Sequence, residues 1–343
     1  MSDSKIRNMD DFASVSGISR PTISKYFNDA DSVRKSTRER IEKALARYDY
    51  QPNFYAMNQN RRLTKNVGIV IPYMSDPFFA EIARNVENHI IAAGFRPIVL
   101  GSQGNPEQEI ENLNNLRLLK PAGVLLAPLG RMSDSERIAA FCSEVPTVLF
   151  DANIENVGEA FIGSDNNQSI GLIVEYLCRT GEPPAFFEMR KPTNPNALKR
   201  RNAYVNSMER SGHKPHLIQV EGEGWDFEEI GFREGSRVLA DRTLPTDTIL
   251  CSNDRLAIGL LSAAYQLGLQ VGLGENCALR IAGHDDHPFS RYTCPTLTTV
   301  SQDYTAIAKK SAETLFSLIE TEQRAQSRET TLFDGRLVMR GSA

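Results

Sequence analysis

The 343-residue sequence has little cysteine, few histidines and no long apolar run, and each shortage excludes a class of protein. Its five cysteines are scattered without a Cys-x-x-Cys pair or a Cys/His ligand spacing, which favours buried reduced thiols over disulfides or a zinc site. No apolar run approaches the roughly 20 residues of a membrane-spanning helix, and the opening MSDSKIRNMDDF lacks the apolar core of a signal peptide. We therefore expect a cytoplasmic protein that does not bind a membrane.

Motifs of the common enzyme classes are missing as well. The sequence has no Gly-x-Gly-x-x-Gly fingerprint, no P-loop and no Gly-x-Ser-x-Gly elbow, and none of its five histidines has a convincing nucleophile as partner. The run His284, Asp285 and Asp286 is a poor metal site, because three successive residues rarely point to one ion and no second ligand cluster accompanies them. We expect neither an enzyme nor a bound metal or cofactor.

Positive charge is concentrated at the start of the chain. Residues 1–65 hold 13 Lys and Arg against 8 Asp and Glu, a net charge of +5, whereas the remaining residues hold 26 against 35, a net charge of −9. A small basic segment joined to a large acidic one is typical of a nucleic-acid-binding module fused to a domain of another kind. Chance clustering on a solvated surface is the alternative that charge alone leaves open.

The basic segment has the pattern of three short helices. Asn8 can cap a first helix that Gly17 ends, and Ser19 can cap a second helix with a proline in its first turn. Ser36 and Glu39 can form a capping box at the start of a third amphipathic helix. Three short helices with a glycine-containing turn between the first two predict a helix-turn-helix module.

The second predicted helix carries residue types that contact DNA. Arg20 and Lys25 are the expected base readers or phosphate partners, because the start of a recognition helix reaches base edges in the major groove. Thr22, Ser24 and Asn28 are expected to bind phosphates. For Thr22 and Ser24, bonding to the helix backbone is the alternative role.

The start of the chain resembles the DNA-binding head of the lactose/galactose repressor family of bacterial transcription regulators, in the segment MDDFASVSGISRPTISKYFNDADSVRKSTRERIEKALARYDYQPN. The segments LTTVSQDY and LVMRGS, near the other end, are similar to the family's late signatures. The resemblance implies DNA contacts from Ser19, Arg20, Pro21, Thr22, Ser24, Lys25, Asn28, Asn53, Ala56, Met57 and Gln59.

The segment PNFYAMNQNRRLTKN corresponds to the family's hinge, which folds into a helix on DNA. Many members wedge a hinge leucine into the minor groove, and here Gln59 stands at that position. Met57 or Leu63 can replace the wedge, or the protein reads or bends its site differently. The hinge has few apolar residues, so we expect it to become ordered when it docks on DNA.

Beyond the hinge, short apolar strands alternate with helices, which predicts an α/β fold of doubly wound parallel sheets. The strands are expected to start near Val67, Pro97, Gly123, Thr147, Ala185, Leu217, Thr248, Leu279 and Leu297. The segment is too long for one small sheet, and it resembles the family's effector domain, which has the two-lobed fold of periplasmic sugar-binding proteins.

We therefore expect the chain to have three parts. Residues 1–51 form a helix-turn-helix domain, residues 52–65 a hinge, and residues 66–343 a two-lobed effector-binding and dimerisation domain. The first lobe is expected to contain residues 66–163 and 294–326, and the second lobe residues 164–293 and 327–343.

Polar side chains follow three of the predicted strands, where a ligand cleft between the lobes is expected. Asp151 follows TVLF, Asn253 follows TILC and Asp285 follows LRIAG, and such acceptors and amides suit a polyhydroxylated ligand. The resemblance implies effector contacts from Phe78, Phe79, Asp151, Arg200, Trp225, Asn253, Asp285 and Gln302. Plain core packing is the alternative for the three aromatic residues.

The sequence thus predicts a ligand-responsive repressor that binds a near-palindromic operator as a homodimer, since two recognition helices related by a twofold axis read adjacent half-sites. The expected effector is a sugar, sugar alcohol or sugar derivative, from a carbohydrate uptake or catabolism operon. A purine or another small metabolite is the alternative. A free-standing sugar-binding protein is a further one, but it would need a signal peptide and no helix-turn-helix.

Overall fold

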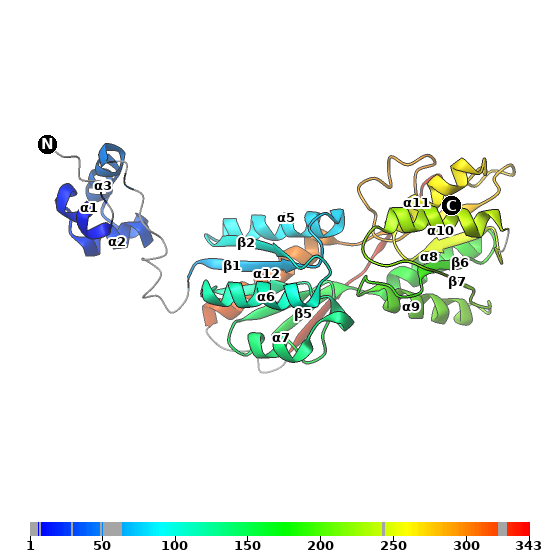
Figure 1. Ribbon diagram of the computed structural model, residues 1–343, viewed down its shortest axis with the longest axis horizontal. Coiled ribbons are helices and arrows are strands. Elements are labelled where there is room, and N and C mark those ends of the chain that lie inside the picture. Colours follow the sequence, from blue (N-terminus) through cyan, green and yellow to red (C-terminus); the bar gives the residue numbers. More distant parts are fainter. Residues whose placement is uncertain are drawn as a thin grey trace. The chain divides into compact units, whose positions relative to one another are not determined.

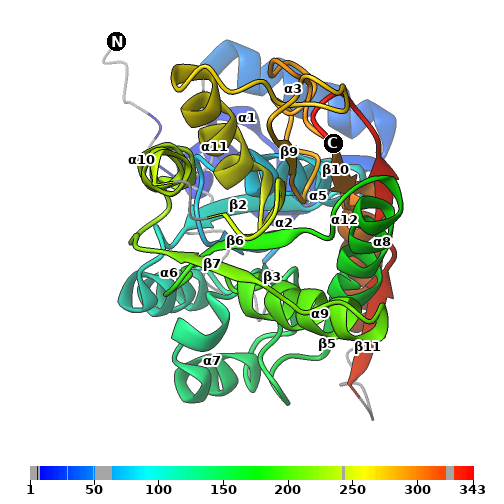
Figure 2. The same cartoon turned by 90° about the vertical axis from the view of Figure 1, so that its right-hand side faces the viewer.

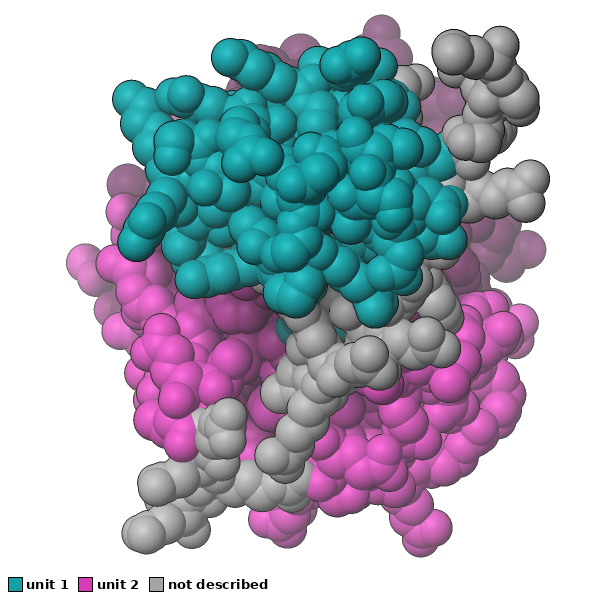
Figure 3. Space-filling view, turned by 90° about the vertical axis from the view of Figure 1, so that its left-hand side faces the viewer, with its two compact units in different colours: residues 1–64 teal, residues 65–343 magenta. Residues whose placement is uncertain are grey.

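A computed structural model describes residues 6, 8–28, 30–48, 50, 64–241, 244–321 and 328–343 (Figure 1). The chain divides into two compact units, Met1–Thr64 and Lys65–Ala343, which Figure 3 distinguishes by colour. This division agrees with a head and a body joined near residue 65. The expected hinge lies outside the described residues except at its last two positions, 64 and 65.

The first unit contains the three predicted helices, α1 (Met9–Ser16), α2 (Arg20–Asn28) and α3 (Lys35–Tyr48), with a 3₁₀ helix η1 (Ala30–Ser32) before α3. The side chain of Asn8 accepts a hydrogen bond from the backbone N–H of Asp11 at 2.8 Å and caps α1 as expected. Gly17 ends α1 in a left-handed conformation, with φ 63°, that favours glycine. Helix α3 begins at Lys35, so Ser36 lies within its first turn and is not the cap that we expected.

A small apolar core fixes these helices against one another. It is formed by Phe12, Ile18, Ile23, Ile41, Ala44 and Tyr50. The ring of Phe12 stacks on that of Tyr50, with the centroids 4.6 Å apart. The core leaves the outer face of α2 available, since Arg20, Pro21 and Lys25 are exposed.

The second unit has two lobes, and the first is built on a six-stranded parallel sheet in the order β11-β5-β4-β3-β1-β2 (Figure 1). Its strands are β1 (Asn66–Ile71), β2 (Arg96–Gly101), β3 (Gly123–Leu126), β4 (Thr147–Phe150), β5 (Ala160–Ser164) and β11 (Glu329–Phe333). Helices α5 (Pro77–Ala92) and α12 (Tyr304–Thr321) cover one face, and α6 (Pro106–Leu118) and α7 (Ser135–Cys142) cover the other. The two covered faces explain why the central strands β1, β3, β4 and β5 are buried and mostly apolar, whereas the edge strands β2 and β11 are partly exposed.

The second lobe is built on a parallel sheet in the order β7-β6-β8-β9 (Figure 2). Its strands are β6 (Ala185–Met189), β7 (Leu217–Val220), β8 (Thr248–Cys251) and β9 (Arg280–Ala282), and β10 (Thr299–Ser301) pairs antiparallel with β12 (Arg336–Val338) beside it. Helices α8 (Asn166–Thr180) and α9 (Ala197–Arg210) pack on one face, and α10 (Phe227–Ala240) and α11 (Asp254–Gln266) on the other.

The sheets correct the expected lobe boundaries. Residues 329–333 form β11 and pair with β5 of the first lobe, so the last crossing follows β11 and does not lie near 326. Residues 298–301 bridge to residues 282–285 of the second lobe, so the second crossing follows Ser301 and not residue 293. Sequence pattern also missed β5, β11 and β12, which are short strands whose partners are remote in sequence.

Helices α10 and α11 approach closely because each has a glycine at their contact. A Cβ atom on Gly259 would lie 2.1 Å from the carbonyl oxygen of Glu228, and one on Gly231 would lie 2.3 Å from that of Leu256. Both neighbours are backbone atoms, so the helices would have to separate. Helix α11 carries Asn253 and Arg255 of the site described below, so its packing positions part of that site.

We expect Gly259→Ala to lower the free energy of unfolding by about 1 to 3 kcal/mol, because it overpacks a backbone contact. Gly171→Ala in α8 is the matched control, since its added Cβ meets only side-chain atoms at 3.5 Å or more. That control should be neutral or raise stability by up to about 1 kcal/mol. Urea unfolding of both variants measures the difference, and equal effects would contradict the interpretation.

Candidate functional site

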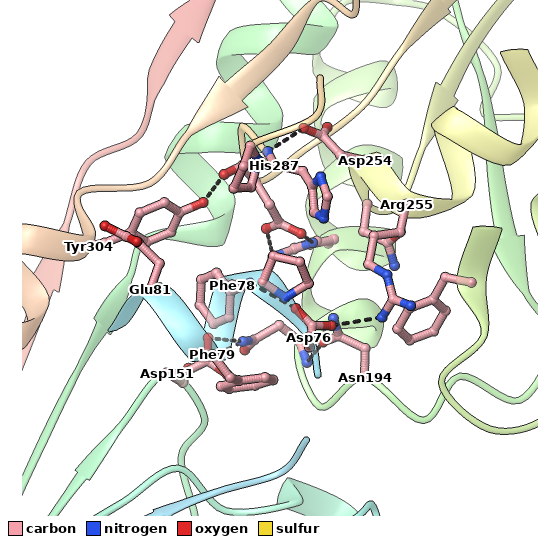
Figure 4. A pocket seen from close by; sticks show the side chains of 17 residues that line it. Asp76, Phe78, Phe79, Glu81, Asp151, Asn194, Asp254, Arg255, His287 and Tyr304 are labelled. Carbon is pink, nitrogen blue, oxygen red and sulfur yellow. Dashed lines mark hydrogen bonds and ion pairs between the residues drawn. The ribbon is translucent and has the colours of Figure 1, made fainter. Parts of the chain in front are cut away.

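A pocket lies between the lobes at the carboxyl ends of their strands (Figure 4). It is lined by Asp76, Pro77, Phe78, Phe79, Glu81, Asp151, Asn194, Asn196, Arg200, Phe227, Asn253, Asp254, Arg255, Asp285, His287, Pro288 and Tyr304. Of the eight residues expected to contact an effector, six line it, and Trp225 and Gln302 do not.

Arg200 and Asp285 form a buried two-pronged ion pair in the wall of this pocket. The two terminal nitrogens of Arg200 lie 3.1 and 2.5 Å from the carboxylate oxygens of Asp285. Arg200 also donates to the side chain of Asn166 at 3.2 Å and to the backbone carbonyl of Ser252 at 2.8 Å. Both charges are therefore compensated and held in one geometry.

The backbone at Asp285 has a φ of 120°, which L residues rarely adopt. Several contacts hold it there. The side chain of Gln302 donates to Asp285 Oδ1 at 2.6 Å, and the hydroxyl of Tyr304 donates to the backbone carbonyl of Asp285. Gln302 in turn accepts from the hydroxyl of Ser164. Gln302 thus positions Asp285 from behind the pocket, which differs from the direct effector contact that we expected.

Charge and hydrogen bonding set the protonation of this cluster. Burial alone would raise the pKa of Asp285, but the positive charge of Arg200 and a hydrogen bond from His284 lower it to about 2. Burial, together with the charge of Arg200, lowers the pKa of His284 to about 4. A neutral His284 can donate from Nδ1 to Asp285 at 3.0 Å and accept at Nε2 from Ser169 at 2.9 Å. His284 therefore holds the carboxylate of Asp285 by a hydrogen bond without adding a positive charge.

Asp151 lines the pocket from the first lobe, and its protonation differs from that of Asp285. Burial raises its pKa to about 7, despite the positive charges of Arg200 and Lys199. The side-chain amide of Asn196 donates to its Oδ1 at 2.9 Å. Its φ of 61° is a left-handed conformation that Asp and Asn tolerate best among residues with a side chain. Near neutral pH, Asp151 can therefore either donate or accept a hydrogen bond.

Helix α11 supplies three successive residues. Asn253 caps the helix, accepting from the backbone N–H of Leu256 at 2.8 Å. The carboxylate of Asp254 accepts from the hydroxyls of Ser290 and Thr299, each at 2.6 Å, and burial raises its pKa to about 7. Asn253 and Asp254 are thus engaged by the protein, although both line the pocket.

Arg255, the third of these residues, connects the two lobes. It donates to Asp76 of the first lobe at 3.0 Å (Figure 4). It also makes a two-pronged pair with Glu228 of the second lobe, with both distances 2.7 Å. Asp76 also caps α5 by accepting from the backbone N–H of Phe78 at 2.9 Å. This contact ties the first turn of α5 to that of α11 across the mouth of the pocket.

The aromatic residues divide into two groups. Phe78 and Phe79 line the pocket edge to face, with the ring centroids 4.9 Å apart. Trp225 stacks on Tyr73 of the first lobe at 5.4 Å, and a Cβ on Gly104 would lie 2.4 Å from its indole nitrogen. In this conformation Trp225 does not line the pocket, because its ring packs against Tyr73, and its expected effector contact stays a prediction.

The pocket encloses about 40 Å³, which is room for about three water molecules. Pockets that enclose a small-molecule ligand typically have volumes of roughly 300 Å³ or more. The lobes must therefore separate, breaking contacts such as Arg255–Asp76, before such a ligand can enter.

Sequence reasoning missed several pocket residues. Asp76 and Arg255 lie 179 positions apart and meet only because the lobes do. Asn196 was missed although it lies near Arg200 in sequence, and Tyr304 although it follows the LTTVSQ segment. The Asp-Pro pair at 76–77, five residues after the end of a predicted strand, was a usable signal for a helix cap at the cleft.

In the first unit, the residues expected to read DNA lie on and just before α2. Ser19, Arg20, Pro21 and Lys25 are exposed, and Thr22 and Ser24 are half-buried. The hydroxyls of Ser19 and Thr22 lie 2.8 Å apart, and Arg20 is 3.3 Å from Asp10. The side chain of Asn28, and all of Asn53, Ala56, Met57 and Gln59, lie outside the described residues.

Two further structural features concern metals and membranes. Within the described ranges, no three or more His, Cys, Asp or Glu side chains gather as they would around a metal ion. Within the same ranges, no helix has both the length and the apolar character that crossing a bilayer requires.

Two family models match the chain. Residues 168–343 match the periplasmic binding protein-like domain, and residues 8–53 match the bacterial regulatory proteins of the lacI family. The HTH-type transcriptional repressor PurR of Pasteurella multocida is 28% identical over 317 residues, which are 92% of this chain and 93% of PurR. The ribose operon repressor of Escherichia coli is 27% identical over 323 residues, which are 93% and 95% of the two chains.

Solved structures show the same fold. The lac repressor dimer bound to operator and the anti-inducer ONPF superposes with a TM-score of 0.82 at 23% identity, over 98% of this chain and 99% of that one. A periplasmic binding protein/LacI transcriptional regulator from Alkaliphilus metalliredigens, complexed with D-xylulofuranose, has a TM-score of 0.69 at 20% identity, over 82% of this chain and 99% of that one.

The raised pKa of Asp151 predicts a pH dependence of stability. A carboxyl group with a folded pKa of about 7 stabilises the fold fully below its unfolded pKa, and this contribution is lost as the pH rises through 7. We expect Asp151→Asn to keep the bond from Asn196 and to lose less stability between pH 5 and pH 8, by on the order of 1 kcal/mol or more.

Denaturant unfolding at both pH values measures this difference. Asp226→Asn, at an exposed position before α10, is the control and should follow the wild-type profile. An Asp151→Asn protein with the wild-type pH profile would show that Asp151 is ionised throughout.

Proposed function

The chain belongs to the lacI family of bacterial regulatory proteins, with a periplasmic-binding-protein-like domain, and from this we propose how its repressor function is controlled. The proposal is that a small hydroxyl-bearing effector binds between Arg200, Asp285 and Asp151, and that its binding changes operator affinity. We further propose that it acts in the cytoplasm as a homodimer, is not an enzyme, and regulates carbohydrate uptake or catabolism.

The proposed class of effector rests on one observation, which is that carboxyl groups outnumber positively charged groups in the pocket lining. The lining includes the five carboxyl groups of Asp76, Glu81, Asp151, Asp254 and Asp285, against two arginines. Carboxylates accept from adjacent hydroxyl groups, so a sugar or sugar alcohol suits the pocket. The likeness to a ribose operon repressor supports the same class.

A purine is the second candidate. The pocket is also lined by the rings of Phe78, Phe79, Phe227 and Tyr304, which can cover a planar base. The likeness to proteins named PurR favours this alternative. A thermal-shift screen of sugars, sugar alcohols and purines separates the two, since a ligand at 100 times its Kd stabilises the native state by about 2.7 kcal/mol.

Control of DNA binding by the effector follows from the closed pocket. A ligand shifts an equilibrium between open and closed lobes by its differential affinity for the two states. Separation of the lobes breaks Arg255–Asp76 and the stacking of Trp225 on Tyr73, and a bound effector replaces these contacts with its own. We propose that this exchange changes the arrangement of the first lobe of each protomer, to which the hinge and head are joined.

We expect Arg20→Ala to weaken binding to the cognate operator by roughly 1 to 3 kcal/mol and to relax base preference at one position of each half-site. The operator can be selected from a random DNA library with the purified protein. Lys43→Ala, an exposed change in α3, is the control and should leave base preference intact. Unchanged affinity and preference in Arg20→Ala would show that Arg20 is not a base reader.

The effector site is tested by neutralising both members of its central ion pair, because removing one would leave a buried unpaired charge. We expect Arg200→Gln/Asp285→Asn to bind the effector at least tenfold more weakly in calorimetry, which is about 1.4 kcal/mol, and to keep operator binding. The control Arg179→Gln/Glu175→Gln neutralises an exposed pair in α8. Wild-type effector affinity in the first variant would refute the assignment.

A further inference from the structure

A second cavity, of about 270 Å³, opens between the lobes beside the effector pocket. It is lined by Leu129, Arg131, Met132, Arg190, Lys191, Pro192, Thr193, Asn194, Pro195, Leu198 and Arg201. Four of these residues are Lys or Arg and none is acidic. We call it the basic cavity.

The positive charge of the basic cavity is only partly compensated. Arg190 pairs with Glu221 at 3.2 Å, where both side chains are more than half exposed and the pair is weak. Arg201 lies 2.5 Å from the buried carboxylate of Glu188. Within the part of the chain that the structure describes, Arg131 and Lys191 form no ion pair. A surplus of about two positive charges therefore faces the cavity.

The cavity is built by both lobes. Arg131 lies in the 3₁₀ helix η2 (Gly130–Met132), which follows β3 of the first lobe, and the backbone N–H of Leu129 just before it donates to the buried carboxylate of Glu109 at 2.9 Å. The other cationic residues follow β6 or lie in α9 of the second lobe. The first turn of α9 contributes Leu198, so the positive end of that helix dipole adds to the same potential.

The two neighbouring cavities have opposite charge, and Asn194 lines both of them. The effector pocket has five carboxyl groups against two arginines, whereas the basic cavity has only cationic groups among its charged lining. An anion is therefore repelled from the first and attracted to the second. In the closed arrangement, the like charges of Arg131 and Lys191 also oppose each other across the lobes unless an anion lies between them.

We propose that the basic cavity binds a phosphate-type dianion, either as a free ion or as the phosphoryl group of the effector itself. Guanidinium groups match phosphate oxygens in charge and in two-pronged geometry. Such a ligand bridges Arg131 of one lobe and Arg190 and Lys191 of the other, so its binding favours closed lobes. This site is separate from the hydroxyl-binding role assigned to Arg200 and Asp285.

The test is calorimetric titration of the full chain with inorganic pyrophosphate at constant ionic strength, held with sodium chloride. We expect Arg131→Gln/Lys191→Gln to bind pyrophosphate at least tenfold more weakly than wild type. The control Arg179→Gln/Arg237→Gln removes two exposed positive charges from the second lobe, outside the cavity, and should bind as wild type does. Absence of binding to wild type, or equal weakening in both variants, would overturn the proposal.

Two further experiments complete the test. The first distinguishes this site from the effector site, and the second shows whether the bound phosphate is a free ion or part of the effector. Arg200→Gln/Asp285→Asn should bind pyrophosphate like wild type, whether or not the proposed effector role is correct, and a tenfold loss there would overturn a separate anion site. A site for the effector's own phosphoryl group predicts tighter binding of ribose 5-phosphate than of ribose, with competition by pyrophosphate. A free-anion site predicts that ribose 5-phosphate displaces pyrophosphate no better than inorganic phosphate does, and that ribose does not displace it.

Discussion

The ion pair between Arg200 and Asp285 is the interaction on which the pocket depends. It connects the start of α9 to the end of β9, and the further bonds of Arg200 reach Asn166 in α8 and the backbone after β8. Since both charges are buried, loss of either partner alone would cost roughly 3 to 5 kcal/mol. The same pair holds Asp285 in its unusual backbone conformation, and through Gln302 it fixes the point at which the chain returns to the first lobe.

The protonation states around this pair follow from its charge. Arg200 keeps the pKa of Asp285 low, whereas burial, together with the charge of Arg200, keeps His284 neutral, and burial raises the pKa values of Asp151 and Asp254 to about 7. The pocket therefore combines one fixed carboxylate, Asp285, with Asp151, which can donate or accept a hydrogen bond, while Asp254 is engaged by Ser290 and Thr299. This combination suits a ligand with hydroxyl groups, because each hydroxyl both donates and accepts a hydrogen bond.

Contacts between the lobes compete with the ligand for the same space. Arg255 donates to Asp76 across the pocket, and Trp225 stacks on Tyr73 nearby. These polar and aromatic side chains therefore have partners in the other lobe when the lobes are closed without a ligand. A ligand that replaces them can shift the balance between open and closed lobes with a modest difference in free energy. The opposite charges of the two cavities, which share Asn194, add a second means of selecting the ligand.

Local features were determined by the sequence itself. The cap at Asn8, the left-handed Gly17, the alternation of strands and helices, and the polar residues at strand ends all depend on neighbours within a few positions. Tertiary structure decided the rest. The return of β11 to the first lobe, the stacking of Trp225 on Tyr73 and the ion pair between Arg255 and Asp76 join residues far apart in sequence. No local pattern encodes these contacts, because they exist only once two separately folded lobes pack against each other.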